Sequence, residues 1–211
     1  RFSPNVITRP LYQEVILPNL CYIGGGGELA YWMQLKSYFE EARVAFPVLL
    51  LRNSVLLVPS KSMEKIKKLK VDINDLFLSQ NDLIKKLTHI NSEIEIDMSP
   101  QKEHLKKQFE DLHKLVELTD KSFLGAVAAQ ERKQIKGLEN LEKRLLKAQK
   151  RQLSDYLDRV KLVHDDLFPN GSLQERQKNF SEFYLENGRE LIHLLQANLN
   201  PLALEFLVLE T

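Results

Sequence analysis

Four consecutive glycines, Gly24 to Gly27, constrain the fold of this chain more than any other feature. They follow a short apolar run, 20–23, and precede a stretch with apolar residues at helical spacing, 28–43. A second apolar run, 46–51, comes next and is continuous, as is typical of buried parallel strands. Strand, glycine turn, helix and strand form a βαβ unit, so the sequence predicts an α/β fold with a parallel sheet.

Composition narrows the class of protein. Of the 211 residues 43% are hydrophobic, which is enough for a core, and 30 basic residues nearly balance 29 acidic ones. A net charge of +1 argues neither for a nucleic-acid binder nor for an acidic tail. No apolar run approaches the roughly 20 residues of a membrane helix. We therefore expect a cytoplasmic protein with no nucleic-acid or membrane partner.

The cysteine and histidine content argues against a metal site. A single cysteine, Cys21, excludes an internal disulfide framework and a cysteine-rich zinc site. Because it lies within an apolar run with no histidine nearby in sequence, we expect a small buried core residue and not a nucleophile. The five histidines are scattered with no i, i+4 pair, so we predict no bound metal.

After Ser60 the sequence becomes rich in Lys, Glu, Leu and Gln, which favours helices. A third strand is expected at 55–58 before this change, and the apolar tail 204–209 is expected to return to the core as an edge strand. Helices are predicted over about 61–70, 80–90, 99–118, 120–167, 172–186 and 188–197. The predicted domains are 1–60 for the core, 61–187 for a helical domain and 188–211 for a returning segment.

Apolar residues in the two longest predicted helices recur at coiled-coil spacing. The first series runs from Leu105 to Thr119, and a second continues through Leu141 to Leu167 with a slip near Gln152. One unbroken rod over 99–167 would be about 100 Å long, too long for the rest of the chain to cover. The sequence therefore predicts an antiparallel helical hairpin, and both Thr119-Asp120 and Gly125 are candidates for its turn.

The glycine turn is the first candidate site. Glycines let backbone N–H groups approach a ligand, and the helix that follows favours negative charge at its start, so Gly24, Gly25, Gly26 and Gly27 fit a phosphate or carboxylate. A tight turn that needs positive backbone angles is the alternative. Arg9 and Arg52 each lie at the edge of an element, where a guanidinium can hold the same anions. Surface ion pairing is their alternative role.

Polar residues around these groups complete the candidate set. Gln13 and Glu14 lie on the short helix after Arg9, and Glu28 opens the helix after the glycines, where a carboxylate can hold an amine or orient a nucleophile. Stabilising the helix dipole is the alternative for Glu28. Four further residues are candidates for hydrogen bonds to a ligand or, equally, for ordinary turns: Ser3, Asn5, Asn53 and Ser54.

A basic run from Arg132 to Arg151 holds eight basic and two acidic residues. It offers a surface to a phosphate, a nucleic acid or an acidic partner. No aromatic residue interleaves it, as single-strand binders would require. A solvated helix face is the interpretation we adopt.

Several motifs in a consistent order resemble the family of bacillithiol biosynthesis enzymes that add cysteine to glucosaminyl-malate. They are Phe2–Val6, Arg9–Glu14, Tyr22–Trp32, Phe46–Leu49 with Arg52–Ser54, Leu167–Pro169 with Gly171, Leu173–Arg176 and Asn200–Leu202. The resemblance implies a Rossmann-like, nucleotidyltransferase-type core followed by an antiparallel coiled-coil domain. It aligns with only the C-terminal part of the family, so we expect a fragment that holds part of an active site.

The same resemblance implies a function. The expected activity is a ligase that joins L-cysteine to glucosaminyl-malate by an amide bond, with ATP or ADP as nucleotide and a homodimer formed through the coiled coil. Arg9, Glu14 and Arg52 are then the expected catalytic residues, and the other polar residues and glycines named above bind substrate or nucleotide. The alternative function is a coiled-coil dimerisation scaffold with a nucleotide-binding core and no ligase activity of its own.

Overall fold

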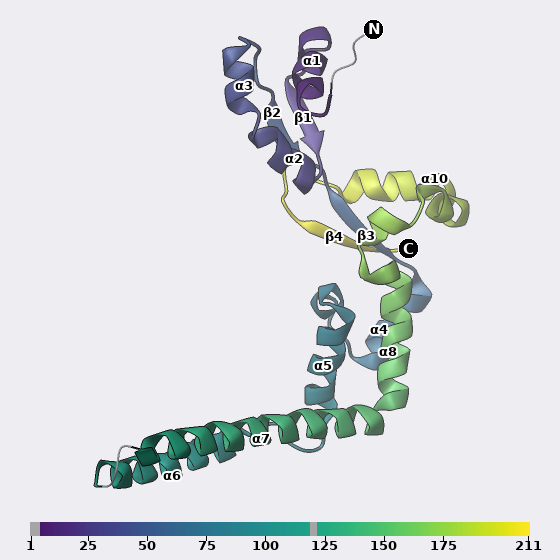
Figure 1. The fold of residues 1–211 in the computed structure, drawn as a ribbon. Helices are drawn as coiled ribbons and strands as arrows, with labels where there is room; N and C mark the ends of the chain where they lie inside the picture. The colour runs from purple at the N-terminus through teal and green to yellow at the C-terminus, as the bar shows by residue number, and fades with distance from the viewer. Residues whose placement is uncertain (1–4, 119–121) are drawn as a thin grey trace. The chain divides into compact units, whose positions relative to one another are not determined.

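The computed structural model describes residues 5–118 and 122–211, which belong to two compact units (Figure 1). One unit is formed by Arg1–Pro59 with Leu173–Thr211, and the other by Ser60–Ser172. The chain thus returns to the first unit at Leu173, earlier than the boundary at 188 that the sequence suggested. Ser3, Thr119 and Asp120 lie outside the described residues.

The first unit contains the βαβ arrangement that the glycine run predicted. Helix α1 (Thr8–Ile16) leads into strand β1 (Cys21–Gly24), which pairs in parallel with β2 (Val48–Leu51). Parallel strands need a crossover between them, and the helical segment after the glycines supplies it. The predicted α/β class is confirmed.

The crossover consists of two helices, so the prediction of one helix over 28–43 is wrong. Helix α2 (Gly26–Met33) ends before α3 (Lys36–Glu41), and the N–H of Leu35 donates to the carbonyl of Trp32 at 2.9 Å. This i to i−3 bond tightens the chain between the helices. As a result Trp32, Leu35 and Phe39 lie in one buried cluster.

Aromatic side chains dominate that cluster, which covers one face of the sheet. Tyr22 stacks on Trp32 with ring centroids 4.1 Å apart, and Phe39 meets Phe46 edge-on at 5.1 Å. Such contacts stabilise a core beyond the burial of apolar area. The helical layer is therefore fixed to β1 through Tyr22.

The prediction that both strands are buried is wrong. Ile23 is 62% exposed, Val48 is 68% exposed, and Cys21 is exposed where a core residue was expected. Side chains alternate across a strand, so Cys21 and Ile23 face away from Tyr22 and its cluster. The described residues leave this second face of the sheet open to solvent.

A second parallel pair completes the first unit. Strand β3 (Ser54–Val58) pairs with β4 (Phe206–Glu210), so the tail forms a strand as predicted. Helix α10 (Phe180–Asn198) packs Leu191 against Leu57 and Leu209.

The predicted helices over 172–186 and 188–197 are replaced by α9 (Gln174–Gln177) and α10. A capping box starts α10, because Asn179 Oδ1 accepts from the N–H of Ser181 at 2.9 Å and Glu182 Oε1 accepts from the N–H of Asn179 at 3.0 Å. Gly188, with φ 59° and ψ −144°, interrupts the helical backbone within α10.

The second unit is helical (Figure 1). Its elements are α4 (Ser60–Leu69), η1 (Asn74–Phe77), α5 (Gln80–Asn91), α6 (Ser99–Glu117), α7 (Ser122–Gln152), α8 (Ser154–Leu167) and η2 (Pro169–Gly171). The single helix predicted over 120–167 is wrong, because α7 and α8 are separated at Leu153, beside the slip in the apolar series. The later residues of that series, Leu157, Val160, Val163 and Leu167, are buried.

Helices α6 and α7 lie side by side and antiparallel, as the hairpin prediction required (Figure 1). Lys102 pairs with Glu142 at 2.5 Å, and His113 pairs with Glu131 at 3.1 Å. From the first pair to the second, the residue number rises by eleven on α6 and falls by eleven on α7, as antiparallel helices require. Gly125 lies within α7, so the alternative of a turn at Gly125 is wrong. The other candidate turn falls outside the described residues.

Candidate anion-binding site at the glycine turn

The glycine turn forms the start of α2. Gly25 is the N-cap residue, and its N–H donates to Glu28 Oε2 at 2.8 Å, so Glu28 closes the first turn of the helix. The next N–H groups of an α-helix have no acceptor within the helix and carry partial positive charge. Gly26 and Gly27 therefore present backbone donors that suit an anion.

None of these four glycines is required by its backbone angle, and only Gly24 and Gly25 have close neighbours that a side chain would meet. Among the described glycines only Gly171 and Gly188 have positive φ, so the interpretation of a turn that needs positive angles is wrong. A Cβ at Gly24 would lie 2.9 Å from Tyr22 Cε1, whereas one at Gly26 or Gly27 would meet no atom within 4 Å. The last two positions keep the backbone open without serving the packing of this chain.

Two arginines converge on Gly25. A Cβ there would lie 3.2 Å from Arg176 Nη2 and 3.6 Å from Arg52 Cζ. Arg52 follows β2, and its N–H donates to the carbonyl of Gly24 at 2.9 Å, which fixes it beside the turn. Two guanidinium groups at the start of a helix form a locus that attracts phosphate or carboxylate.

Helix α9 brings Arg176 to the turn, and a buried glutamine holds α9 in place. Gln174 Oε1 accepts from the N–H of Leu57 at 3.0 Å, and its Nε2 donates to the carbonyl of Leu57 at 2.9 Å. Gln174 is 4% exposed, so both hydrogen bonds are shielded from water. The position of Arg176 is thereby tied to β3.

Glu175 balances part of this positive charge. Its Oε1 lies 3.6 Å from Arg52 Nη2, and the two side chains are 23% and 40% exposed. A partly exposed pair at this distance contributes little to stability. Glu28 is a second carboxylate at the turn, so the attraction for an anion rests on Arg52, Arg176 and the N–H groups of Gly26 and Gly27 and not on a net positive charge.

Besides Glu28 and Arg52, three predicted site residues have contacts within the chain itself. Glu14 is buried, and its two oxygens accept from the backbone and side-chain N–H groups of Asn19 at 2.8 and 2.9 Å. Asn5 Oδ1 accepts from the N–H groups of Ile7 and Thr8. Asn53 Nδ2 donates to the carbonyl of Asn200 at 2.8 Å.

The remaining predicted residues that the structure describes belong to other elements. Arg9 and Gln13 lie on α1, and Ser54 starts β3 opposite Phe206. Sequence reasoning missed Glu175 and Arg176 as site residues, although their motif had supported the family resemblance. That motif was the only signal in the sequence that pointed to them.

Within residues 5–118 and 122–211, no three side chains of His, Cys, Asp or Glu are grouped as metal ligands. No helix there combines the length and the apolar character needed to cross a bilayer.

Fold and site together define a Rossmann-like α/β unit with two arginines at its glycine turn, joined to a helical coiled-coil hairpin. Family models match both parts: "Bacillithiol biosynthesis BshC, N-terminal Rossmann-like domain" over residues 1–53 and "Bacillithiol biosynthesis BshC, C-terminal coiled-coil domain" over residues 55–211. The chain therefore belongs to the bacillithiol biosynthesis BshC family. The resemblance seen in the sequence is confirmed.

Relatives of the chain carry the name "Putative cysteine ligase BshC". One from Christiangramia forsetii is 62% identical over 209 residues, which are 99% of this chain and 39% of the relative. One from Flavobacterium johnsoniae is 61% identical over 206 residues, 98% of this chain and 39% of the relative. One from Bacillus cereus strain B4264 is 29% identical over 202 residues, which are 94% of this chain and 37% of the relative. The chain thus spans about two fifths of the length of these relatives.

Proposed function

We propose that this chain forms part of a ligase that joins L-cysteine to glucosaminyl-malate by an amide bond in bacillithiol biosynthesis, with the glycine turn holding nucleotide phosphate. The observation that carries the proposal is the convergence of Arg52 and Arg176 on Gly25 at the start of α2. Family membership and the names of the relatives support the choice of cysteine as substrate. We place the reaction in the cytoplasm, where a cysteine thiol stays reduced.

The chemistry of amide formation explains the need for such a site. A carboxylate is a poor electrophile, so one of its oxygens must leave with a phosphoryl or nucleotidyl group while the new C–N bond forms and the amine loses a proton. When bound, ATP supplies the phosphoryl or nucleotidyl group that leaves with this oxygen. Arg52, Arg176 and the N–H groups of Gly26 and Gly27 would hold its phosphates and stabilise the charge that develops on them.

The test uses the full-length protein with cysteine, ATP and glucosaminyl-malate. Mass spectrometry is expected to show a product heavier than glucosaminyl-malate by one cysteine minus one water. Chromatography of the nucleotides then identifies the broken phosphate bond, since ADP and AMP report different leaving groups. If no nucleotide supports product formation, the ligase proposal is rejected.

Replacing Gly26 or Gly27 with alanine should separate binding from folding. Because no atom would lie within 4 Å of the new methyl group, we expect unchanged stability or a gain of about 0.5–1 kcal/mol from helix propensity. The methyl group narrows the approach to the backbone donors, so ATP affinity is expected to fall about fivefold or more by calorimetry. Gly125→Ala in α7, which is equally free of contacts, is the matched control. Unchanged ATP affinity in both turn variants would show that these N–H groups do not hold the phosphate.

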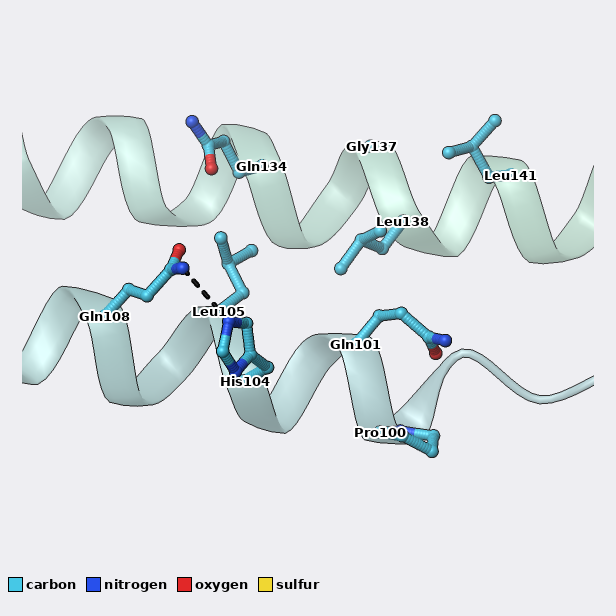
Figure 2. A pocket seen from close by; sticks show the side chains of 9 residues that line it. All are labelled: Pro100, Gln101, His104, Leu105, Gln108, Gln134, Gly137, Leu138 and Leu141. Carbon is cyan, nitrogen blue, oxygen red and sulfur yellow. Dashed lines mark hydrogen bonds between the residues drawn. The ribbon is translucent and has the colours of Figure 1, made fainter.

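The coiled-coil hairpin favours a second function, which is dimerisation. A groove of about 780 Å³ between α6 and α7 is lined by Pro100, Gln101, His104, Leu105, Gln108, Gln134, Gly137, Leu138 and Leu141 (Figure 2). Leu141 is 51% exposed although it belongs to the apolar series. We propose that a second copy of the chain covers this groove, since exposed apolar residues at coiled-coil spacing suit another helix of the same kind.

Leu141→Lys tests the dimer. We expect light scattering after gel filtration to show a dimer for the parent chain and a monomer for the variant, with unchanged helical circular dichroism because Leu141 is half exposed. Asn140→Lys adds the same charge at the neighbouring position, outside the groove, and should remain dimeric. If the Leu141→Lys variant remains a dimer by light scattering, the groove is not the interface.

A further inference from the structure

A cavity of about 300 Å³ lies within the first unit, between β3, α9 and α10. Its polar lining includes Asn53, Glu175 and Lys178, and its aromatic lining is formed by Phe180 and Phe183. This volume is at the lower end of the range for small-molecule sites, so it suits a compound of the size of a substituted monosaccharide.

Two of the lining residues connect the cavity to the glycine turn. Asn53 directly follows Arg52 in sequence, and Glu175 Oε1 lies 3.6 Å from Arg52 Nη2. Arg52 in turn lies against Gly25, where the proposed function places a nucleotide phosphate. In an amide-forming ligation the amine must come within about 3–3.5 Å of the activated carboxyl group, so the acceptor belongs next to the nucleotide.

Two side chains of opposite charge lie on the same face of one helical turn. Glu175 and Lys178 are three residues apart, which places their Cβ atoms about 5–6 Å from each other. The N–H of Lys178 donates to the carbonyl of Gln174 at 2.9 Å and closes this turn. Because Glu175 also pairs with Arg52, its carboxylate marks the end of the cavity nearest the glycine turn. Lys178 supplies a cation one turn further along.

Aromatic rings form the apolar part of the lining. Phe183 packs against the core cluster that contains Leu57, and Lys178 Nζ lies 5.9 Å from the centroid of this ring. A cation–π contact at this distance holds the ammonium group close to the wall of the cavity. Phe180 is 50% exposed, so it offers an aromatic surface that the core does not use. The C–H face of a sugar ring is apolar and suits such a surface.

We propose that this cavity binds the acceptor of the ligation, an amino sugar linked to a dicarboxylate, and this proposal rests on the function proposed above. The sugar ring covers Phe180 and Phe183. The amine donates to Glu175, and a carboxylate of the malate part pairs with Lys178. In glucosaminyl-malate the amine and the malate group are attached to neighbouring carbons of the sugar, which matches two charges that lie one helical turn apart.

This placement gives Glu175 a role in the reaction. The amine nitrogen forms the C–N bond with the activated carboxyl carbon of cysteine, and the C–O bond to the phosphoryl or nucleotidyl group breaks. The amine loses one proton in this step, and the carboxylate of Glu175 accepts it.

The first test measures binding of glucosaminyl-malate to the full-length protein by calorimetry, with and without ADP. Lys178→Gln removes the cation for the malate carboxylate and is expected to weaken binding about tenfold or more. Lys36→Gln removes an exposed lysine from α3 in the same unit and should bind within about twofold of the parent. Circular dichroism checks that both variants fold. Parent affinity in the folded Lys178→Gln variant, or no saturable binding by the parent under either condition, would overturn the proposal.

The second test uses glucosyl-malate, which has a hydroxyl group in place of the amine. The parent protein is expected to bind it about fivefold or more weakly than glucosaminyl-malate. In Glu175→Gln this difference should fall below about twofold, because the carboxylate that prefers the amine is gone. If the variant discriminates between the two compounds as strongly as the parent does, the amine does not lie at Glu175 and the proposed arrangement is wrong.

The outcomes separate this proposal from the ligase proposal. If the parent binds glucosaminyl-malate and Lys178→Gln does not, but no nucleotide supports product formation, the cavity is the site of the amino sugar and the ligase proposal is rejected. If product forms and both variants keep the parent KM for glucosaminyl-malate, the protein is a ligase whose acceptor binds elsewhere.

Discussion

Replacing Arg52 and Arg176 together with glutamine is expected to lower the rate of cysteine ligation by about 10²-fold or more, since removing a single donor from a charge-stabilising site already costs about that much. Both guanidinium groups lie against Gly25, where a phosphate would meet the start of α2. Glutamine keeps polarity and much of the side-chain length but removes the charge. Product mass spectrometry over time on the full-length protein measures the rate.

The control for this pair is Arg189→Gln, which removes an exposed arginine from α10 in the same unit. It should retain the parent rate. Thermal denaturation of all variants separates loss of chemistry from loss of fold, and the partly exposed Arg52–Glu175 pair is expected to contribute little to stability. If the folded double variant ligates at the parent rate, neither arginine takes part in the reaction.

Phe39→Ala should produce the largest loss of stability in the first unit, about 3–5 kcal/mol. Phe39 is fully buried and contacts Phe46 and Trp32, with ring centroids 5.1 and 5.9 Å away. Its removal leaves a cavity between the crossover helices and the sheet. Urea denaturation followed by tryptophan fluorescence measures the loss, and Trp32, the single tryptophan of the chain, reports directly on this cluster.

Tyr38→Ala is the matched control for this variant. Tyr38 is the neighbouring residue on α3 and is 37% exposed, so its loss should cost about 1 kcal/mol. If Phe39→Ala costs no more than Tyr38→Ala, the aromatic cluster does not hold the crossover helices to β1.

The sequence predicted those parts of the fold that local pattern determines. The glycine run between two apolar segments required a crossover, and β1 and β2 are parallel as a result. The slip near Gln152 coincides with the point where α7 ends and α8 begins, but the prediction carried one helix across it and was wrong there. Burial was harder to predict, because an apolar run does not show whether another layer covers both of its faces. Ile23 is therefore exposed although its run is typical of a buried strand.

The candidate site was predicted in part. Arg52 was identified because it directly follows the second strand, at the edge of the sheet where the glycines also lie. Arg176 was not identified, because the whole helical unit separates it from Gly25 in sequence. The two residues come together only because the chain returns to the first unit. The carboxylate of Glu14 looked catalytic from its position after Arg9, and no local pattern revealed that Asn19 would engage both of its oxygens.

The glutamine that holds α9 also hinders the addition of a foreign strand at the edge of β3. The edge of a sheet presents unpaired N–H and C=O groups that act as a template for a strand from another molecule. β3 pairs with β4 on one side, and on the other the Gln174 amide occupies both backbone groups of Leu57, near the middle of the strand. A foreign strand cannot add there without displacing two buried hydrogen bonds, so one side chain blocks intermolecular pairing along this edge.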